Sequence, residues 1–347
     1  MGRPSGAYNV SYNQDMAILR TGLQWGLFIA LMAALFLLPL LVQGYAISFL
    51  ISIGITLIVA MGLNLLMGYC GQISVGQSAF MGVGGFAAAL LVVKLGLSFW
   101  VALPLAGLIA GIVGMVFGAP SLRLKGLYLA LATLAAQFII LFVIVRLLRG
   151  GSGYRVPAPS LGGFALDSDP KYYYLVLVVA ILMTYFAKSL VRTRTGRAFV
   201  AIRDNDIAAE TMGVSVFRYK LLAFFIGCFY AGIGGALWVY WLGVAQAEHY
   251  TLMESIWYLA IVVVGGGGSI VGTIFGTLFI RGAAEVAQRL APAIGDAVPA
   301  LAGNLGASLP LIFLGLAVVL FLIFEPRGLA HRWELFKASY RLHPFSY

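Results

Sequence analysis

The sequence predicts an all-α polytopic membrane protein, and three observations lead to this fold class. Of its 347 residues, 62% are hydrophobic and only 10% are charged. Soluble domains are about half apolar and about a quarter charged, and a soluble chain of this length could not hide so much apolar surface. The apolar residues also form long runs, which is the pattern of helices that cross a lipid bilayer.

A membrane-spanning helix needs about 20 mainly apolar residues. About ten segments come close to this length, and the weakest of them are 77–95, which is glycine-rich, and 254–266, which is short. We therefore predict a single bundle of about ten transmembrane helices over residues 23–43, 45–67, 77–95, 98–119, 127–148, 172–190, 219–242, 254–266, 270–290 and 308–324.

The distribution of Lys and Arg predicts the orientation, because these residues gather in cytoplasmic loops. Most of them fall on one side if both termini are cytoplasmic, and the net charge of +10 then reflects this bias rather than nucleic-acid binding. The predicted parts are a cytoplasmic arm (1–22), a transmembrane domain (23–324) and a cytoplasmic tail (325–347). We expect the charged residues of the later helices near their outer ends: Glu254, Arg281, Glu285 and Arg289.

Two segments interrupt the pattern of long helices and short turns, Gly68–Gly85 and Gly265–Gly268. Irregular backbone within a membrane requires shielding by protein or a water-filled cavity, and in transporters such interruptions indicate the substrate path. A turn at the cytoplasmic face is the alternative for both. Nearby polar side chains are candidates to line the path, although each could equally make an interhelical hydrogen bond: Asn64, Gln72, Ser74, Gln77, Ser78, Tyr128, Thr133 and Gln137.

Small residues recur four positions apart within the apolar segments. This spacing places them on one helix face, where they allow two helix backbones to approach closely. Glycine is common in any transmembrane helix, so the pattern predicts tight packing but no particular helix pair. The pairs are Gly22/Gly26, Gly107/Gly111, Gly114/Gly118 and Gly272/Gly276.

The longest polar segment, 191–220, is predicted to be cytoplasmic and to contain two short helices, Gly196–Arg203 and Ile207–Met212. Asp and Asn between them suit a helix N-terminus, and Gly213 suits a helix end. The arginines could bind anionic lipid, but the acidic residues favour a protein partner. We expect four apolar side chains to face that partner: Phe199, Ile202, Ile207 and Met212.

Five stretches, in this order along the chain, carry a specific resemblance. They are GLNLLMGYCGQISVGQSAFMGVGG, LRLKGLYLALATLAAQ, TGRAFVAIRDNDIAAETMGVSVFRYKLLAF, SIWYLAIVVVGGGGSIVGTIFG and IFEPRGL. Over residues 45–329 the chain resembles the permease family of branched-chain amino acid ABC transporters, and the larger of the two permease subunits in particular. The family often has His where this chain has Gln77, which leaves the solute open between branched-chain amino acids, urea or amides, and aromatic acids.

The resemblance implies an importer subunit in the bacterial inner membrane that forms half of a translocation path. Its expected partners are a second homologous permease subunit, two ATP-binding subunits, a periplasmic solute-binding protein and membrane lipid, with no nucleic acid. By the same resemblance, segment 191–220, here called the coupling segment, would dock in a cleft of the ATPase. The residues assigned to docking are Arg197, Phe199, Arg203, Asp204, Asp206, Glu210 and Gly213.

Enzymatic activity is not expected of this chain. The sequence contains no G-x-x-x-x-G-K-[ST] motif to bind ATP phosphates, and no cofactor is predicted. Cys70 and Cys228 are too few and too far apart for a typical metal site, so no metal is predicted either. An ion-coupled secondary carrier or a channel is the alternative function, and a membrane-embedded enzyme ranks below both.

Overall fold

The computed structural model describes residues 22–42, 44–121, 126–146, 153–161, 164–297 and 302–342, and most of these residues are helical. The helices are α2 (Gly22–Leu41), α3 (Tyr45–Leu63), the π-helix η1 (Asn64–Tyr69), α4 (Gln77–Val93), α5 (Phe99–Ser121), α6 (Leu127–Arg146), α7 (Asp169–Arg192), α8 (Arg194–Asp204), α9 (Asp206–Thr211), α10 (Val216–Leu242), the 3₁₀ helix η2 (Ala247–His249), α11 (Leu252–Gly265), α12 (Ile270–Ala297), α13 (Ala302–Phe324) and α14 (Gly328–Leu342).

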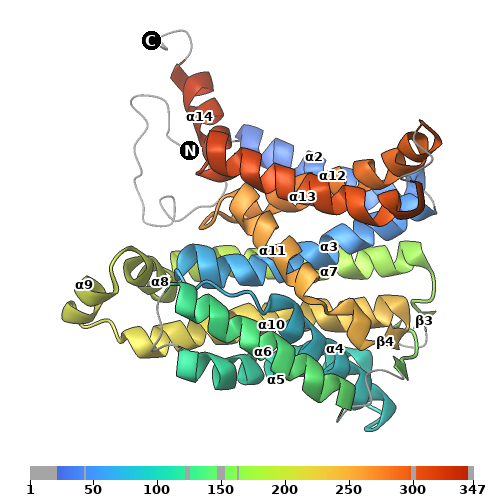
Figure 1. Cartoon of the computed structure of the whole chain (residues 1–347), viewed down its shortest axis with the longest axis horizontal. Coiled ribbons are helices and arrows are strands. Elements are labelled where there is room, and N and C mark those ends of the chain that lie inside the picture. The colour runs from blue at the N-terminus through green and yellow to red at the C-terminus, as the bar shows by residue number, and fades with distance from the viewer. Residues whose placement is uncertain are drawn as a thin grey trace.

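Four two-residue strands form two small antiparallel pairs. Strand β1 (Tyr154–Arg155) pairs with β4 (Val244–Ala245), and β2 (Ser160–Leu161) pairs with β3 (Phe164–Ala165). The β1–β4 pair joins the segment before α7 to the segment after α10. It lies at the end of the bundle opposite to α8 and α9 (Figure 1).

The predicted all-α membrane fold is confirmed, and each of the ten apolar segments carries a helix. Within the described ranges, six helices are long and apolar enough to cross a membrane, and the α13–α14 pair, bent by 49°, would make a seventh. Ten crossings, cytoplasmic termini and the division into arm, domain and tail stay predictions. Most of the arm, 1–21, lies outside the described residues.

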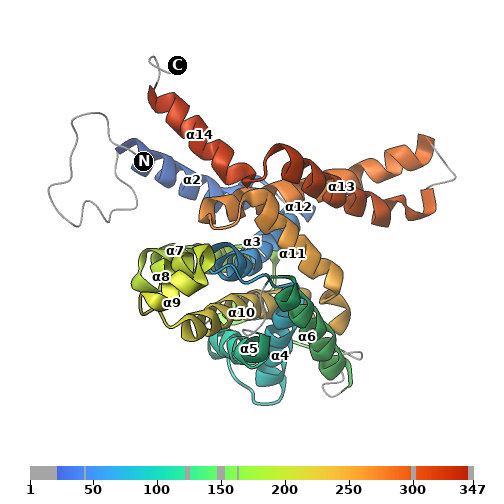
Figure 2. The same ribbon diagram turned by 60° about the vertical axis from the view of Figure 1, so that its left-hand side comes forward.

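Helix α10 lies at the centre of one layer, packed against α3, α4 and α5. Helices α12 and α13 form a second layer together with α2 and α14, and α11 lies between the two layers (Figures 1 and 2). Because α8 and α9 project from one end of the bundle and the strands close the other, the two ends of the molecule have different structures.

The glycines of α5 form one packing face. A Cβ atom added to Gly107, Gly111, Gly114 or Gly118 would lie within 3.0 Å of a side chain of α10. The helix that these regularly spaced glycines contact is therefore α10, which could not be identified from the sequence. Gly272 and Gly276 similarly face α11, whereas no described atom lies within 4 Å of a Cβ added to Gly22 or Gly26.

Helices α4 and α10 approach each other even more closely. A Cβ added to Gly84 would lie 2.2 Å from the Cα of Gly232, and one added to Gly235 would lie 1.9 Å from the carbonyl oxygen of Met81. Here the backbones of the two helices contact each other directly. Small residues allow such close packing in a membrane, where the hydrophobic effect does not drive helices together. The position of α4 therefore depends on residues that have no side chain.

Two helices are shorter than most helices that cross a bilayer. Helix α4 has 17 residues and α11 has 14. At about 1.5 Å per residue they are roughly 26 and 21 Å long, whereas the hydrocarbon core is about 30 Å thick. Each follows a segment without a long helix, 70–76 or 243–251, and each has a fully buried residue in its first turn, Ser78 or Ser255.

Two charged residues of the later helices, Glu254 and Arg281, form an ion pair between α11 and α12. Arg281 lies near the middle of the 23-residue apolar stretch Ile270–Pro292. Glu254 lies in the first turn of the short helix α11 and pairs with it. Glu254 lies at one end of its helix, whereas Arg281 is well inside α12. That both lie near the outer side of the membrane stays a prediction.

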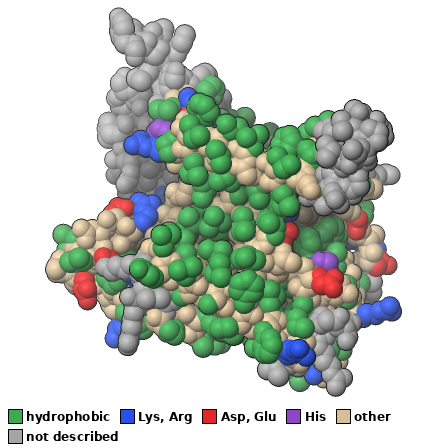
Figure 3. Space-filling model, viewed as in Figure 1, with side chains coloured by type: hydrophobic (Ala, Val, Ile, Leu, Met, Phe, Trp, Pro, Cys, Tyr) green, Lys and Arg blue, Asp and Glu red, His purple; other side chains and the backbone are tan. Residues whose placement is uncertain are grey.

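The surface of the molecule agrees with a lipid environment. Large apolar side chains are exposed on α2, α5, α6, α7, α12 and α13. Figure 3 shows this apolar band across the middle of one face, with most of the charged side chains toward the two ends. The exposed apolar area is therefore distributed as expected for a chain that crosses a membrane several times.

The close approach of α4 and α10 predicts that Gly84→Ala destabilises the chain by about 2 kcal/mol or more, because an added methyl group overlaps Gly232. Gly315→Ala on α13 is the matched control, because no described atom lies within 4 Å of its Cβ position. Alanine there should stabilise the helix by up to about 1 kcal/mol. Thermal unfolding of both purified variants in detergent tests this, and equal stability of the two would contradict it.

Candidate functional site

The two interrupted segments predicted from the sequence lie against each other. The side chain of Asn64, at the start of η1, donates hydrogen bonds to Thr273 Oγ1 (2.7 Å) and to the carbonyl oxygen of Ser269 (3.0 Å). Its Oδ1 accepts from the backbone N–H of Gly268 at 2.8 Å. A Cβ added to Gly68 would lie 2.2 Å from the nitrogen of Gly268. Asn64 therefore joins η1 to the four-glycine turn between α11 and α12.

The extended segment 71–76 re-enters the bundle along α6. The N–H of Val75 donates to Thr133 Oγ1 at 3.0 Å, and the N–H of Gly76 donates to Ser74 Oγ at 3.4 Å. Gln72 donates from Nε2 to the carbonyl oxygen of Cys70 at 3.3 Å. Polar side chains thus form hydrogen bonds with backbone groups that lie outside any helix, as irregular backbone in a membrane requires.

The N-termini of α4 and α11 meet inside the bundle. The N–H of Ser78 donates to Ser255 Oγ at 2.9 Å. Gln137 of α6 accepts from the N–H of Ala79 (2.9 Å) and from Ser255 Oγ (3.2 Å), and it donates to the carbonyl oxygen of Tyr250 (2.9 Å). One amide side chain therefore connects both short helices and the segment that precedes α11.

The two short helices run in opposite directions from this meeting point. Gly71, before α4, approaches Arg203 of α8, and Phe86 of α4 contacts Tyr154 of β1. Helix α11 instead starts from the β4 side and ends at Gly265, beside the four-glycine turn that contacts Gly68. The two helices therefore point toward opposite ends of the bundle, as the broken helices of transporters do around a central site.

Gln77, where the resembling family often has His, is completely buried. Its Nε2 donates to the carbonyl oxygens of Val59 and Gly227, each at 3.2 Å. Its Oε1 has no partner in the part of the chain that the structure describes, and the same holds for Gln72 Oε1 and Ser78 Oγ. Gln77 and Ser78 belong to the first turn of α4, whereas Gln72 lines the pocket beside α8.

Seven of the eight predicted path residues gather around η1, segment 71–76 and the start of α4. All seven are buried and hold these elements in place. Tyr128 is different, because its side chain is 70% exposed near the start of α6. The structure thus brings seven of the residues together and leaves one apart, while contact with a solute stays a prediction.

The coupling segment folds as the two predicted helices, α8 and α9, with boundaries shifted by one or two residues. Asn205 lies between them and its Oδ1 accepts from the N–H of Ala208 at 3.0 Å, which caps α9. Gly213 ends α9 with φ of 84°, a conformation that favours glycine. Its N–H donates to the carbonyl oxygen of Glu210 at 2.9 Å.

The apolar side chains of the coupling segment divide into two sets. Phe199 is fully buried and Ile202 is 3% exposed, whereas Ile207 and Met212 are 68% and 86% exposed. The expectation that Phe199 and Ile202 face a partner is therefore wrong. They attach α8 to the bundle, where the ring of Phe199 contacts Tyr219 edge to face. Ile207 and Met212 remain available to a partner.

The charged docking residues also differ in their contacts. Arg197, Asp204 and Glu210 are exposed, whereas Asp206 is partly buried and lies 3.4 Å from the ammonium group of the buried Lys220. Arg203 donates from Nη1 to the carbonyl oxygen of Gly68 at 3.0 Å. Helix α8 is therefore bonded directly to the end of η1.

A pocket of about 320 Å³ opens between the coupling segment and segment 70–72. Its lining includes Cys70, Gln72, Arg203, Asp206 and Lys220. The Cys70 thiol is buried within this lining. The described residues hold no group of His, Cys, Asp and Glu side chains suited to a metal ion.

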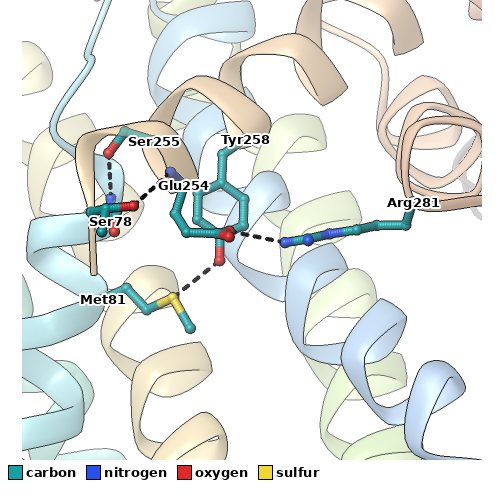
Figure 4. A network of polar contacts seen from close by, with 7 residues as sticks. Ser78, Met81, Glu254, Ser255, Tyr258 and Arg281 are labelled. Atoms are coloured by element: carbon teal, nitrogen blue, oxygen red, sulfur yellow. Dashed lines mark hydrogen bonds and ion pairs between the residues drawn. The ribbon is translucent and has the colours of Figure 1, made fainter. Parts of the chain in front are cut away.

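Sequence reasoning missed the ion pair between Glu254 and Arg281, in which Oε2 and Nη2 are 3.1 Å apart. Figure 4 shows Arg281 of α12 reaching toward the start of α11, close to the Ser78–Ser255 contact. In the same view Tyr258 donates to the sulfur of Met81 at 3.1 Å. Charges are rare at membrane depth, and the position of Arg281 within an apolar run was the available signal.

Comparisons with known proteins agree with these features. Residues 45–323 match the family described as "Branched-chain amino acid transport system / permease component". The chain is 32% identical over 331 residues to the high-affinity branched-chain amino acid transport system permease protein LivM of Escherichia coli K12, which covers 85% of this chain and 74% of that protein. The LivM protein of Salmonella typhimurium LT2 is 31% identical with the same coverage.

More distant similarity extends to another kind of permease. The ribose import permease protein RbsC of Escherichia coli K12 is 26% identical over 189 residues, which cover 50% of this chain and 59% of RbsC. No solved structure matches the chain.

The family match begins at the start of α3 and ends within α13, so it contains both interrupted segments, the short helices α4 and α11, and the coupling segment. The resemblance that the sequence motifs indicated is thereby confirmed. This multi-pass membrane protein belongs to the family of branched-chain amino acid transport permease components.

Proposed function

We propose that the chain is the transmembrane permease subunit of an ATP-binding-cassette importer in the bacterial inner membrane. It forms half of the translocation path for branched-chain or other hydrophobic amino acids. The observation that carries this proposal is the continuous family match over residues 45–323, together with 32% identity to a permease named for branched-chain amino acid transport.

The energy for transport comes from other subunits. The sequence has no phosphate-binding G-x-x-x-x-G-K-[ST] motif, so two separate ATP-binding subunits hydrolyse ATP. A second, homologous permease completes the path, and a periplasmic binding protein delivers the solute. Selection of the solute is then shared between that binding protein and the path.

The coupling segment offers an exposed surface to the ATP-binding subunits. Ile207 and Met212 provide apolar contact, and Glu210 provides charge. Movement of this surface passes directly to the path, because Arg203 links α8 to Gly68 at the end of η1. Closure of the ATPases around ATP would therefore move α8 and η1 together, as in alternating access by rigid-body rocking.

The path passes the meeting point of α4 and α11. The buried amides and hydroxyls there, Asn64, Thr133 and Gln137 among them, fix the backbone of the path through internal hydrogen bonds. The oxygens of Gln72, Gln77 and Ser78 that lack a partner among the described residues are the groups left to accept from water or solute. Tyr128, which is exposed, would contact lipid or the second permease.

Uptake measurements test the proposed function. Cells that lack this chain should lose uptake of labelled L-valine, and expression of the wild-type chain should restore it. The purified chain alone, reconstituted in lipid vesicles, should not accumulate valine with or without ATP. Restored uptake of a different solute but not of valine would disprove the substrate assignment, and accumulation by the chain alone would disprove the need for ATP-binding subunits.

Charge reversal tests the coupling surface. Glu210→Arg should reduce uptake by about tenfold or more, because a reversed charge in a protein interface creates repulsion. The amount of chain in the membrane should not change, because an exposed substitution costs at most about 0.5 kcal/mol of stability. Glu334→Arg on α14 is the matched control, since Glu334 is also exposed. Equal uptake by the two variants would contradict docking at Glu210.

A further inference from the structure

The ion pair of Glu254 and Arg281 lies where a membrane protein rarely places charge. Arg281 is near the middle of the apolar stretch Ile270–Pro292. Glu254 is in the first turn of α11, which begins within the bundle beside the N-terminus of α4. Ionisable residues within the membrane are costly, and they commonly mark the path of a solute or an ion.

The pair is not closed on itself. The side chains of Arg281 and Glu254 are 18% and 32% exposed, so both reach open space. The Nε atom of Arg281 has no hydrogen-bond partner among the described residues, although it is shielded from solvent. The guanidinium carbon lies 5.8 Å from the centre of the Trp257 ring. On the face drawn in Figure 3, a hollow between the two layers of helices contains both acidic and basic side chains.

We propose that Glu254 and Arg281 form a binding site for the charged headgroup of a zwitterionic α-amino acid as it passes through the permease. Arg281 binds the carboxylate of the solute, and Glu254 binds its ammonium group. This inference rests on the proposed function, because it assigns residues to the recognition of the solute class named there.

The chemistry of the pair matches that headgroup. A guanidinium group has five N–H donors. The contacts of Arg281 with Glu254 and with the hydroxyl group of Tyr258 leave others for a carboxylate. When the amino acid binds, two charges of the protein and two of the solute form a ring in which the signs alternate. The ring has no net charge, so no uncompensated charge is left in a medium of low dielectric constant.

The surroundings favour one orientation of the solute. Glu254 lies in the first turn of α11, where the partial positive charge of the helix N-terminus stabilises its own carboxylate. The ring of Trp257 beside Arg281 offers an apolar surface next to the headgroup. An amino acid with an apolar side chain can then place its carboxylate on Arg281 and its side chain against apolar residues. A sugar or a neutral amide can form hydrogen bonds with this pair, but it has no carboxylate and ammonium group to match the two charges.

Neutral variants test the proposal through uptake of labelled L-valine in cells that lack the chromosomal copy of this chain. Glu254→Gln and Arg281→Gln should each lower the uptake rate by about tenfold or more, the effect of losing one charge-assisted hydrogen bond. The amount of chain in the membrane is measured by immunoblot. Glu285→Gln is the matched control, because Glu285 belongs to a separate ion pair on α12, with Arg289. It should keep at least half of the wild-type rate.

The exchanged pair separates recognition from a structural role. Glu254→Arg combined with Arg281→Glu keeps an ion pair between α11 and α12, so the chain should fold. The carboxylate and ammonium sites are then interchanged, and uptake should stay about tenfold below the wild-type rate or lower. Full recovery of uptake in the exchanged pair would show that the charges only hold the helices together, and it would overturn the proposal.

Ligand-induced stabilisation gives a second, direct measurement. The transporter complex is purified through a tag on this chain, without the binding protein, and its thermal unfolding is followed with millimolar L-valine. Valine should raise the unfolding temperature of the wild type but not of the exchanged pair. Isovalerate, which lacks the ammonium group, and isobutylamine, which lacks the carboxylate, should have no such effect. The site would be overturned if either analogue stabilised the wild type as much as valine does. The same holds if valine stabilised the exchanged pair equally, or did not stabilise the wild type.

The outcomes also distinguish this proposal from the proposed function. If the wild-type chain does not restore uptake of valine, the proposed function fails and the site fails with it. If the wild type restores uptake and either neutral variant transports at the wild-type rate, only the site fails. Loss of uptake in Glu285→Gln as well as in the neutral variants would mean that any charge change on this helix disrupts transport, which also contradicts the site.

Discussion

The structure depends on one constraint, that every backbone polar group inside the membrane has a partner within the protein. Long helices meet this requirement by themselves. The short helices α4 and α11 do not, because the N–H groups of their first turns lack partners within the helix. Ser255, Gln137 and Thr251 provide these partners through their side chains. These polar side chains therefore allow the two helices to begin where no preceding helical turn bonds to their N–H groups.

This arrangement explains why the interior is both tightly packed and irregular. Glycines on α4, α5 and α10 let these helices pack with backbone close to backbone, which fixes α4 laterally. The amide of Gln137 fixes α4 and α11 along their axes. The result is a rigid centre, and one ion pair lies beside it. Chain segments lead from this centre to the end of the bundle that carries α8 and α9 and to the end that carries the strands. A permease needs such a fixed centre if its two ends are to open alternately.

Much of the fold could be predicted because hydropathy and length nearly determine where apolar helices lie. Contacts between helices could not be predicted in the same way. The glycines of α5 indicated a packing face, but nothing in their spacing identified α10 as the partner. Phe199 and Ile207 look alike in sequence, since both are apolar residues of short amphipathic helices, and only the docking of α8 on the bundle separates the buried one from the exposed one. Glu254 and Arg281 belong to different helices, so their pairing was not visible in any local pattern.

The π-helical turn η1 affects which backbone group the coupling segment contacts. A π-turn contains one residue more than an α-turn, so everything that follows it is rotated by about 100° relative to a continuous α-helix. Gly68 lies within this turn, and its carbonyl oxygen accepts the hydrogen bond from Arg203. Deletion of a single residue anywhere in η1 would leave the composition of the helix almost unchanged, yet it would turn another carbonyl toward α8. The helical register at this point, more than the chemistry of any side chain, decides which carbonyl group of η1 Arg203 can bind.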